Sequence, residues 1–199
     1  MEGLKTVPPN EAVALLRDGF VALVPTETVV GLVAAESGLE KLWEIKGRDP
    51  NKPIALLCAS TEEAFAMAVN VPPLAEKLAA TFWPGPLTLV LDASGGGTVG
   101  VRVPDHPAVA ALLVAHGGPI YATSANLAGK HAPRALEEVD PRVAKAVGFA
   151  VEGDPGDGEA SAVVDLSGGK AELLRPGPGL DEAALRRLTG EQGASAPAV

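Results

Sequence analysis

The sequence is poor in cysteine and in aromatic residues, and each scarcity excludes something. Its single cysteine, Cys58, cannot close an intramolecular disulfide, and no cluster of Cys and His is spaced for zinc. Aromatic residues make up only 4% of the chain, so a core has to be built from Val, Leu, Ile and Ala. Hydrophobic residues amount to 47% of the 199 residues, which is sufficient for one domain of ordinary size.

Basic residues are in the minority, with 16 Lys and Arg against 25 Asp and Glu and a formal net charge of −9. This balance argues against a broad surface that coats nucleic acid, but it permits a local cationic cleft. No apolar run approaches the ~18 residues that cross a bilayer, and the first residues lack the basic start and apolar run of a signal peptide. We therefore predict a cytoplasmic protein with no membrane association.

Apolar segments alternate with amphipathic ones along the chain. Buried strands are predicted at 20–24, 54–58, 87–91, 98–103, 120–123, 149–151, 162–166 and 172–174. Helices are predicted at 10–18, 39–46, 61–69, 74–82, 108–116, 136–147 and 180–188, with a loop at 25–32. This interleaving indicates an α/β fold, and strands that follow one another directly make the sheet mixed. We predict one domain over 1–189 and a flexible tail over 190–199.

The first candidate site follows the strand at 20–24, where two hydroxyls flank a carboxylate in Thr26, Glu27 and Thr28. In an extended segment the two threonines lie on one face, because side chains alternate along a strand. One hydroxyl can then bind a ligand while the other fixes the loop. Simple turn chemistry and helix capping explain the same tripeptide, so both readings stay open.

Three cations within seven residues form the second candidate site, namely Lys46, Arg48 and Lys52. A helix C-terminus favours a cation through its dipole, so Lys46 alone indicates little. The neighbouring Gly and Pro residues stiffen the loop, however, and a stiff loop can hold Arg and Lys in one geometry for phosphate. A solvated basic turn is the alternative.

Further polar residues lie at the ends of predicted strands. Ser124 and Asn126 close the strand at 120–123, and a ligand can approach the backbone there because Ala122 and Ala125 are small. Arg102 stands in an otherwise apolar strand, so its charge needs an anionic partner. That partner can be a ligand, or it can be an acidic residue in a structural salt bridge. Ser161 and Arg175 flank the last two strands. The sequence has neither a phosphate-binding loop of the Gly-x-x-x-x-Gly-Lys type nor a dinucleotide fingerprint.

Taken in order, these segments resemble the YrdC-type threonylcarbamoyl-AMP synthase family over nearly the whole chain. The motifs that carry the resemblance are PTETV at 25–29 with GL at 31–32, KGR at 46–48, FWPGPLTLV at 82–90, VRVP at 101–104, SAN at 124–126 and LRPG at 174–177. Each motif is weak by itself, whereas the ordered set is specific.

The resemblance implies a twisted mixed β-sheet with flanking helices around a concave cationic cavity. It implies a nucleotidyltransferase that converts L-threonine, bicarbonate and ATP, with Mg²⁺ bridging the phosphates, into threonylcarbamoyl-AMP and pyrophosphate. The product would feed a separate complex that transfers the threonylcarbamoyl group to tRNA. Such chemistry requires positioning and charge stabilisation more than a covalent nucleophile.

The resemblance also implies roles for individual residues. Those that would contact L-threonine are Thr28, Arg102, Ser161 and the backbone of Ala122. Those that would hold ATP are Arg48, Lys52, Thr98, Ser124, Asn126, Arg175 and the backbone of Ala132. Lys46 and Arg48 are the candidate catalytic residues, and no residue is expected to ligate a metal. The chain departs from the family pattern at Val30, Val33, Leu57 and Ala162.

Two other functions compete with the synthase. A paralogue of the same fold with weak or different carbamoyl-transfer activity would accommodate the four departures. An RNA-binding module could use the same cavity, with at most a weak RNA contact. The net charge of −9 and the few aromatic residues argue against the RNA-binding module, because RNA recognition usually needs basic patches and stacking platforms.

Overall fold

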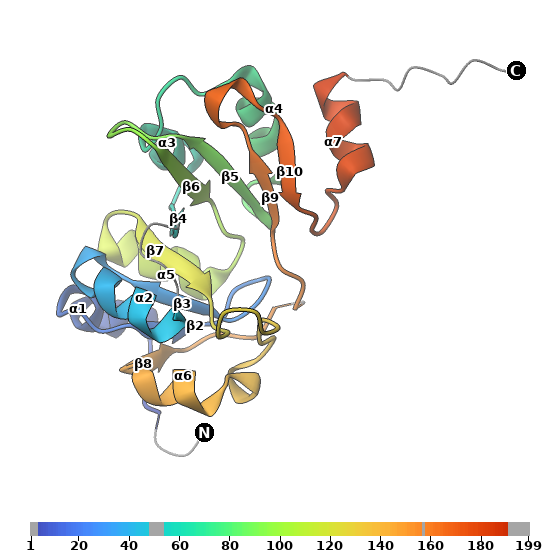
Figure 1. Ribbon diagram of the computed structural model, residues 1–199. Helices are drawn as coiled ribbons and strands as arrows, with labels where there is room; N and C mark the ends of the chain where they lie inside the picture. Colours follow the sequence, from blue (N-terminus) through green and yellow to red (C-terminus); the bar gives the residue numbers. More distant parts are fainter. Residues whose placement is uncertain (1–3, 48–53, 157, 191–199) are drawn as a thin grey trace, which may run out of the picture.

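The computed structural model describes residues 4–47, 54–156 and 158–190, and its strands form one continuous mixed sheet (Figure 1). The strand order is β1-β8-β2-β3-β7-β4-β6-β5-β9-β10. Four neighbouring pairs are parallel, β1 with β8, β8 with β2, β4 with β6, and β5 with β9. The strand bounds are Thr6–Val7, Ala22–Val24, Gly31–Ala34, Ala55–Leu57, Leu87–Asp92, Thr98–Arg102, Ile120–Ser124, Phe149–Val151, Ala162–Asp165 and Glu172–Arg175 for β1 to β10 in chain order.

The helices begin and end at residues suited to helix ends. Their bounds are Pro9–Arg17, Leu39–Lys46, Thr61–Ala66, Pro73–Phe82, Pro107–His116, Pro141–Ala146 and Glu182–Thr189 for α1 to α7. Proline opens α1, α4, α5 and α6, where its missing N–H has no partner to lose. Gly47 ends α2 in the left-handed region with φ of 59°, which glycine adopts without strain. Among the described helices, none has the length and apolarity needed to span a membrane.

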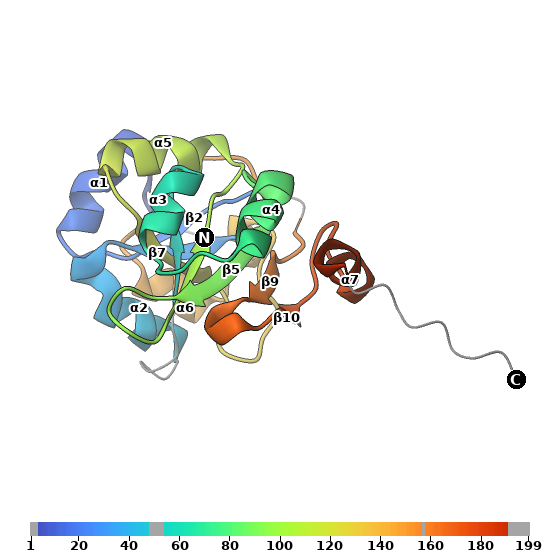
Figure 2. The same ribbon diagram turned by 90° about the horizontal axis from the view of Figure 1, so that it is seen from above.

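One half of the molecule is a three-layer sandwich built on β2, β3, β7 and β8. Helices α1 and α5 pack on one face of these strands, and α2 and α6 cover the other face (Figure 2). Along β2, Ala22 and Val24 contact the first helix layer, whereas Val21 and Leu23 contact the second. Burial on both faces explains why this segment is continuously apolar rather than alternating.

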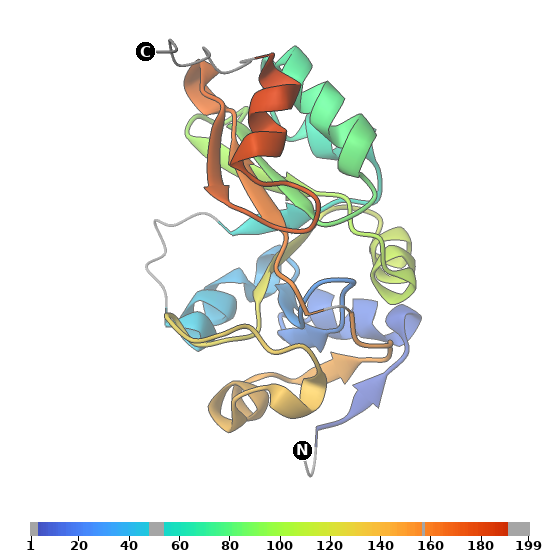
Figure 3. The same ribbon diagram turned by 90° about the vertical axis from the view of Figure 1, so that its right-hand side faces the viewer.

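The other half has helices on one face of the sheet only. Strands β5, β6, β9 and β10 pack against α3, α4 and α7, and α7 lies beside α4 (Figure 3). Alternate side chains of β5, such as Leu87 and Leu89, are buried under these helices. The intervening Thr88 and Val90 face the opposite side, which those helices leave uncovered. This open face provides the surface on which a site can form.

The predicted α/β class, with a twisted mixed sheet and flanking helices, is confirmed, as are most elements. The helix predicted at 39–46 and the strand at 149–151 have the predicted bounds. The prediction of a single helix over 136–147 is wrong. Residues Leu136–Glu138 form a 3₁₀ turn, and α6 starts separately at Pro141, where the Asp140 side chain accepts a hydrogen bond from the Arg142 N–H at 2.9 Å.

The loop predicted at 25–32 is also partly wrong, because Gly31 and Leu32 begin β3. This strand is buried at all four positions and starts with glycine, so the sequence shows neither alternation nor a polar boundary there. It forms because β2 and β7 hydrogen-bond to it on both sides. The two-residue strand β1 was not predicted either, because only its pairing with β8 defines it. The proposed domain bounds stay a prediction, and all of the predicted tail except Gly190 lies outside the described residues.

Candidate active site

A cavity of about 570 Å³ opens between the two halves, on the uncovered face of the sheet. Its floor follows the strand register from β3 to β5. Val33 pairs with Ala122, which pairs with Ala55 on β4, and Val90 pairs with Gly100 on β6. Small residues at 55, 100 and 122 keep the centre of the floor low, so the cavity has depth there. Its volume lies within the ~300–1,000 Å³ typical of pockets for small ligands.

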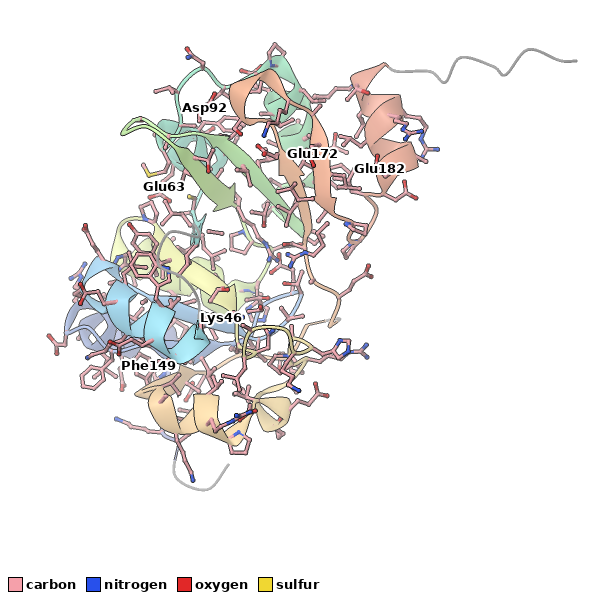
Figure 4. The ribbon with its side chains drawn as sticks, viewed as in Figure 1. Lys46, Glu63, Asp92, Phe149, Glu172 and Glu182 are labelled. Carbon is pink, nitrogen blue, oxygen red and sulfur yellow. The ribbon has the colours of Figure 1, made fainter. Side chains whose placement is uncertain are left out.

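Lys46 joins the KGR motif at 46–48 to the SAN motif at 124–126, at one end of this cavity. Its Nζ donates to the Ser124 carbonyl oxygen at 2.6 Å, to Ser124 Oγ at 3.1 Å and to Asn126 Oδ1 at 2.8 Å. The side chain is buried at the C-terminal end of α2, at the boundary between the two halves (Figure 4). The structure therefore brings Lys46, Ser124 and Asn126 together, while the predicted phosphate ligands Arg48 and Lys52 lie outside the described residues.

Asn126 connects this cluster to the next part of the wall. Its Nδ2 donates to the carbonyl oxygens of Lys130 at 2.5 Å and Leu127 at 3.0 Å. These bonds hold the loop that follows β7 against the cavity, where Lys130, His131 and Ala132 line it. Of these three residues only Ala132 was predicted. The sequence gives little indication of the other two, because the loop has no periodic pattern.

Arg102 lies at the opposite end, because it pairs through Leu57 with Ile120 at the start of β7, whereas Ser124 ends that strand. Its side chain is only 9% exposed. Its Nη2 forms an ion pair with Glu27 Oε1 at 2.5 Å and donates to Thr28 Oγ1 at 3.1 Å. Its Nε donates to the Gly85 carbonyl oxygen at 3.2 Å. The sequence left open whether Arg102 forms a structural salt bridge or faces a ligand, and the structure shows both an ion pair and a place in the cavity lining.

The two threonine hydroxyls of the loop have different surroundings. Thr26 Oγ1 donates to the Val29 carbonyl oxygen at 2.7 Å and accepts from the Thr28 N–H at 3.1 Å, so it fixes the turn. The two hydroxyls are 2.9 Å apart. Since a hydroxyl has one proton and that of Thr26 goes to Val29, Thr28 must donate to Thr26. Thr28 Oγ1 is therefore an acceptor on the cavity lining, and one of its two lone pairs takes the hydrogen bond from Arg102.

Arg175 and Ser161 meet on the adjacent wall. Arg175 Nε donates to the Ser161 carbonyl oxygen at 2.8 Å, and its Nη2 donates to Ser161 Oγ at 3.1 Å. Burial lowers the pKa of Arg175, and repulsion by Arg102 lowers it further. Thr88 Oγ1 lies 3.1 Å from Ser161 Oγ and completes this wall. Sequence reasoning missed Thr88, although a lone polar residue on the open face of an apolar strand is a recognisable signal.

Thr98 and the four departures from the family pattern lie partly inside and partly outside the cavity lining. Thr98 is exposed at the outer end of β6 and is not among the lining residues. Val33 and Leu57 line the cavity, whereas Val30 and Ala162 are fully buried outside the lining. Of the four departures from the family pattern, only Val33 and Leu57 can alter the cavity surface directly. Among the described lining residues, Lys46, Arg102, Lys130 and Arg175 are cationic and none is Asp or Glu.

These features define an α/β protein in which the described residues form a concave site suited to anionic and hydroxyl-bearing ligands. The sequence model of the Sua5/YciO/YrdC family, described as telomere recombination, matches residues 14–177. The chain therefore belongs to the Sua5/YciO/YrdC family.

Relatives and solved structures agree with this assignment. The threonylcarbamoyl-AMP synthase of Pyrococcus abyssi is 36% identical over 90% of this chain and 56% of its own length. That of Bacillus subtilis is 38% identical over 84% of this chain and 52% of its own length. The chain thus spans about half the length of these two relatives.

Two crystal structures share the fold. P. abyssi Sua5 complexed with L-threonine has a TM-score of 0.81 and 36% identity, covering 92% of this chain and 57% of that one. Escherichia coli YciO has a TM-score of 0.79 and 26% identity, covering 89% of this chain and 92% of that one. The twisted mixed sheet with flanking helices is therefore a feature that this chain shares with both.

Proposed function

We propose that the protein is an L-threonylcarbamoyladenylate synthase. L-threonine and bicarbonate form threonine carbamate with loss of water, and a carbamate oxygen then attacks the α-phosphorus of ATP. The new P–O bond replaces the bond to pyrophosphate, which leaves. The enzyme would be a nucleotidyltransferase, and its substrates would be L-threonine, bicarbonate and ATP. Relatives named threonylcarbamoyl-AMP synthase, and a Sua5 structure that contains L-threonine, support the proposal.

The observation that carries the proposal is that two polar clusters border one cavity. Lys46, Ser124 and Asn126 lie at one end, and Arg102 and Thr28 lie at the other. Joining an amino acid to a nucleotide requires both to be bound side by side. A single cavity with separate polar ends satisfies this requirement, whereas two unconnected pockets would not.

The nucleotide would occupy the end with Lys46. Ser124 and Asn126 orient the Lys46 ammonium. Arg175, which binds Ser161 and feels the charge of Arg102, would supply a second cation to the phosphates. Positive charges held in place before the reaction stabilise the charge that develops as pyrophosphate leaves. Arg48 and Lys52 would add to this charge on sequence grounds, and their position lies outside the described residues.

Magnesium would enter with ATP as part of the substrate. The described residues contain no group of three His, Cys, Asp or Glu that could hold a metal ion, and those lining the cavity include no carboxylate. They therefore do not fit a resident divalent cation, because magnesium prefers oxygen ligands, carboxylates among them. ATP phosphates would supply those oxygens instead, and we assign no step to a protein-bound metal.

The downstream partners are proposed on the same basis. The adenylate would pass to a separate complex that transfers the threonylcarbamoyl group to tRNA, in the cytoplasm. A weak RNA contact stays a prediction from sequence.

Pyrophosphate release tests the proposed reaction. The purified protein is incubated with ATP, L-threonine and bicarbonate, and with each mixture that lacks one component. We expect pyrophosphate only when all three are present, because the carbamate is the nucleophile. Consumption of ATP without threonine, or no consumption, would contradict the proposal and favour a paralogue with another substrate. In that case the apolar side chains of Val33 and Leu57 would be the first to examine, since both line the cavity.

A further inference from the structure

Glu27 is the charged member of the Thr-Glu-Thr motif, and no proposed ligand contact uses it. Glu27 is not among the residues that line the cavity, although Thr26 and Thr28 on either side of it are. Oε1 accepts from Arg102 Nη2 at 2.5 Å and from the Asp105 backbone N–H at 3.0 Å. We propose that Glu27 is a positioning residue for the amino-acid end of the cavity, acting through Arg102 and Thr28. This inference rests on the proposed function, because it takes L-threonine as the ligand.

The first step of the argument is the geometry of the Arg102 guanidinium. Its Nε is bonded to Gly85, and its Nη2 is bonded to Glu27 and Thr28. A guanidinium is planar, so fixing Nε and Nη2 also fixes the direction of Nη1. Nη1 forms no hydrogen bond with any residue in the described part of the chain, and Arg102 lines the cavity. The Nη1 donors are therefore available to a ligand anion such as a carboxylate.

The second step is electrostatic. Arg175 faces the same cavity, and its pKa is lowered by burial and then by the positive charge of Arg102. The two guanidiniums repel each other, so Arg102 needs an opposing charge to stay in place. Glu27 forms the single ion pair recorded for Arg102 among residues 4–47, 54–156 and 158–190. Because both side chains are largely buried, solvent screens this pair less than a surface pair.

The third step concerns the hydroxyl of Thr28. Arg102 donates to Thr28 Oγ1, and Thr28 donates its proton to Thr26, whose own proton goes to the Val29 carbonyl oxygen. This directed chain leaves Thr28 as an acceptor next to the donors of Arg102. An amino acid carries an anionic carboxylate beside a hydrogen-bond donor, so it matches the pair. Glu27 supports this arrangement because it accepts from the same Nη2 of Arg102 that donates to Thr28, and so helps to hold that donor in place.

The fourth step concerns the second oxygen of the Glu27 carboxylate. Glu27 Oε2 is buried and has no hydrogen-bond partner among the described residues. A buried oxygen without a partner costs free energy, so the bonds that Glu27 makes act through Oε1, on Arg102 and the Asp105 N–H. The unpartnered Oε2 is consistent with a carboxylate whose role is to hold Arg102 in place.

The test measures the KM for L-threonine and the KM for ATP separately, through pyrophosphate release. Glu27→Ala is expected to raise the threonine KM at least about tenfold, because Arg102 loses a charge-assisted hydrogen bond. The ATP KM should stay within about twofold, since Glu27 acts on the opposite end of the cavity. Glu27→Gln keeps one carbonyl oxygen for Arg102 and Asp105, and neutral hydrogen bonds are weaker, so we expect about a threefold rise.

Glu63→Ala is the matched control. Glu63 Oε2 accepts from the Ala59 backbone N–H at 2.6 Å, in the half that carries α3 and away from the cavity lining (Figure 4). This variant should leave both KM values unchanged. The inference is overturned if both Glu27 variants keep the wild-type threonine KM, or if Glu27→Ala raises both KM values equally. Should Glu27→Ala fail to fold, the Glu27→Gln result decides.

A failure of the proposed function would look different. In that case the wild-type protein itself releases no pyrophosphate in response to threonine. Calorimetric titration of L-threonine into the wild-type protein and into Glu27→Gln then tests the inference without turnover. Weaker binding by the variant supports the positioning role, and equal binding or no binding to either protein overturns it.

Discussion

Arg175 holds Ser161 by two hydrogen bonds, one from Nε to the carbonyl oxygen at 2.8 Å and one from Nη2 to Oγ at 3.1 Å. By resemblance, Arg175 belongs to the ATP end and Ser161 to the threonine end. Their direct contact means that the two ends share a wall. A change at Arg175 therefore reaches both ligands, which sequence reasoning on separate motifs does not anticipate.

Arg175→Lys should weaken both substrates. Lysine keeps the charge but cannot make the two directed bonds to Ser161, because it lacks the planar fork of arginine. We expect the KM values for ATP and L-threonine each to rise about tenfold, as for the loss of one charged hydrogen bond of about 1.4 kcal/mol. Arg142→Lys is the control, since its exposed side chain pairs with Asp140 far from the lining and should leave both KM values unchanged. A rise confined to ATP would show that the wall is not shared.

Lys46→Met should separate nucleotide binding from threonine binding. Methionine has a similar length but no charge, so Ser124 and Asn126 lose the donor that joins them. The acceptors on Ser124 and Asn126 are only partly buried, and Asn126 Oδ1 still accepts from Ser124 Oγ, so the free energy of unfolding should fall by only about 1 kcal/mol. ATP affinity in a calorimetric titration should fall at least about tenfold.

Threonine affinity of the Lys46→Met variant should change little, because Arg102 and Thr28 lie at the other end of the cavity. The control is Lys41→Met, which removes a hydrogen bond to the Gly19 carbonyl oxygen outside the cavity. Undiminished ATP affinity in Lys46→Met would place the nucleotide elsewhere.

Much of the fold could be predicted because its signals are local. Apolar runs and apolar residues at helical spacing located most strands and helices. The exceptions are β1 and β3, which are short and depend on their neighbours. Their pairing is non-local, and no pattern within two to four residues reports it.

The site was predicted in part, for a related reason. The motifs identified Thr28, Arg102 and Ser161 as polar residues at strand ends, and all three line the cavity. The sequence could not show that Arg102 pairs with Glu27, since 75 residues separate them. Thr98 was included by resemblance, yet it lies exposed at the hairpin end, so its role in ATP binding stays a prediction.

The hydroxyls of Thr26 and Thr28 should respond differently to removal. Thr26→Val deletes the bonds to the Val29 carbonyl oxygen and the Thr28 N–H, so the free energy of unfolding should fall by about 1–3 kcal/mol. Thr28→Val deletes the acceptor that faces the cavity, so the threonine KM should rise at least about fivefold with a smaller effect on stability. Thermal unfolding and pyrophosphate kinetics on both variants distinguish the roles. Equal effects on stability and KM in the two variants would mean that the hydroxyls act as one structural unit.

Gly156 should tolerate no side chain, because the segment after β8 passes directly over the Thr26–Glu27 backbone. A Cβ at Gly156 would lie 2.2 Å from the Thr26 carbonyl oxygen and 2.2 Å from the Glu27 carbonyl carbon. Both are backbone atoms, so either this segment or the loop that carries Thr28 must move. We expect Gly156→Ala to lower the free energy of unfolding by about 1–3 kcal/mol and to raise the threonine KM.

Gly118→Ala is the matched control for Gly156→Ala, because a Cβ at Gly118 meets nothing within 4 Å. Urea unfolding should therefore separate the two alanine variants, with Gly118→Ala close to the wild-type protein. Wild-type stability and threonine KM in Gly156→Ala would show that the segment can shift without moving Thr28. A loss of stability with an unchanged threonine KM would mean that the segment yields and the loop stays in place. A rise in the threonine KM would make this segment a support of the amino-acid end.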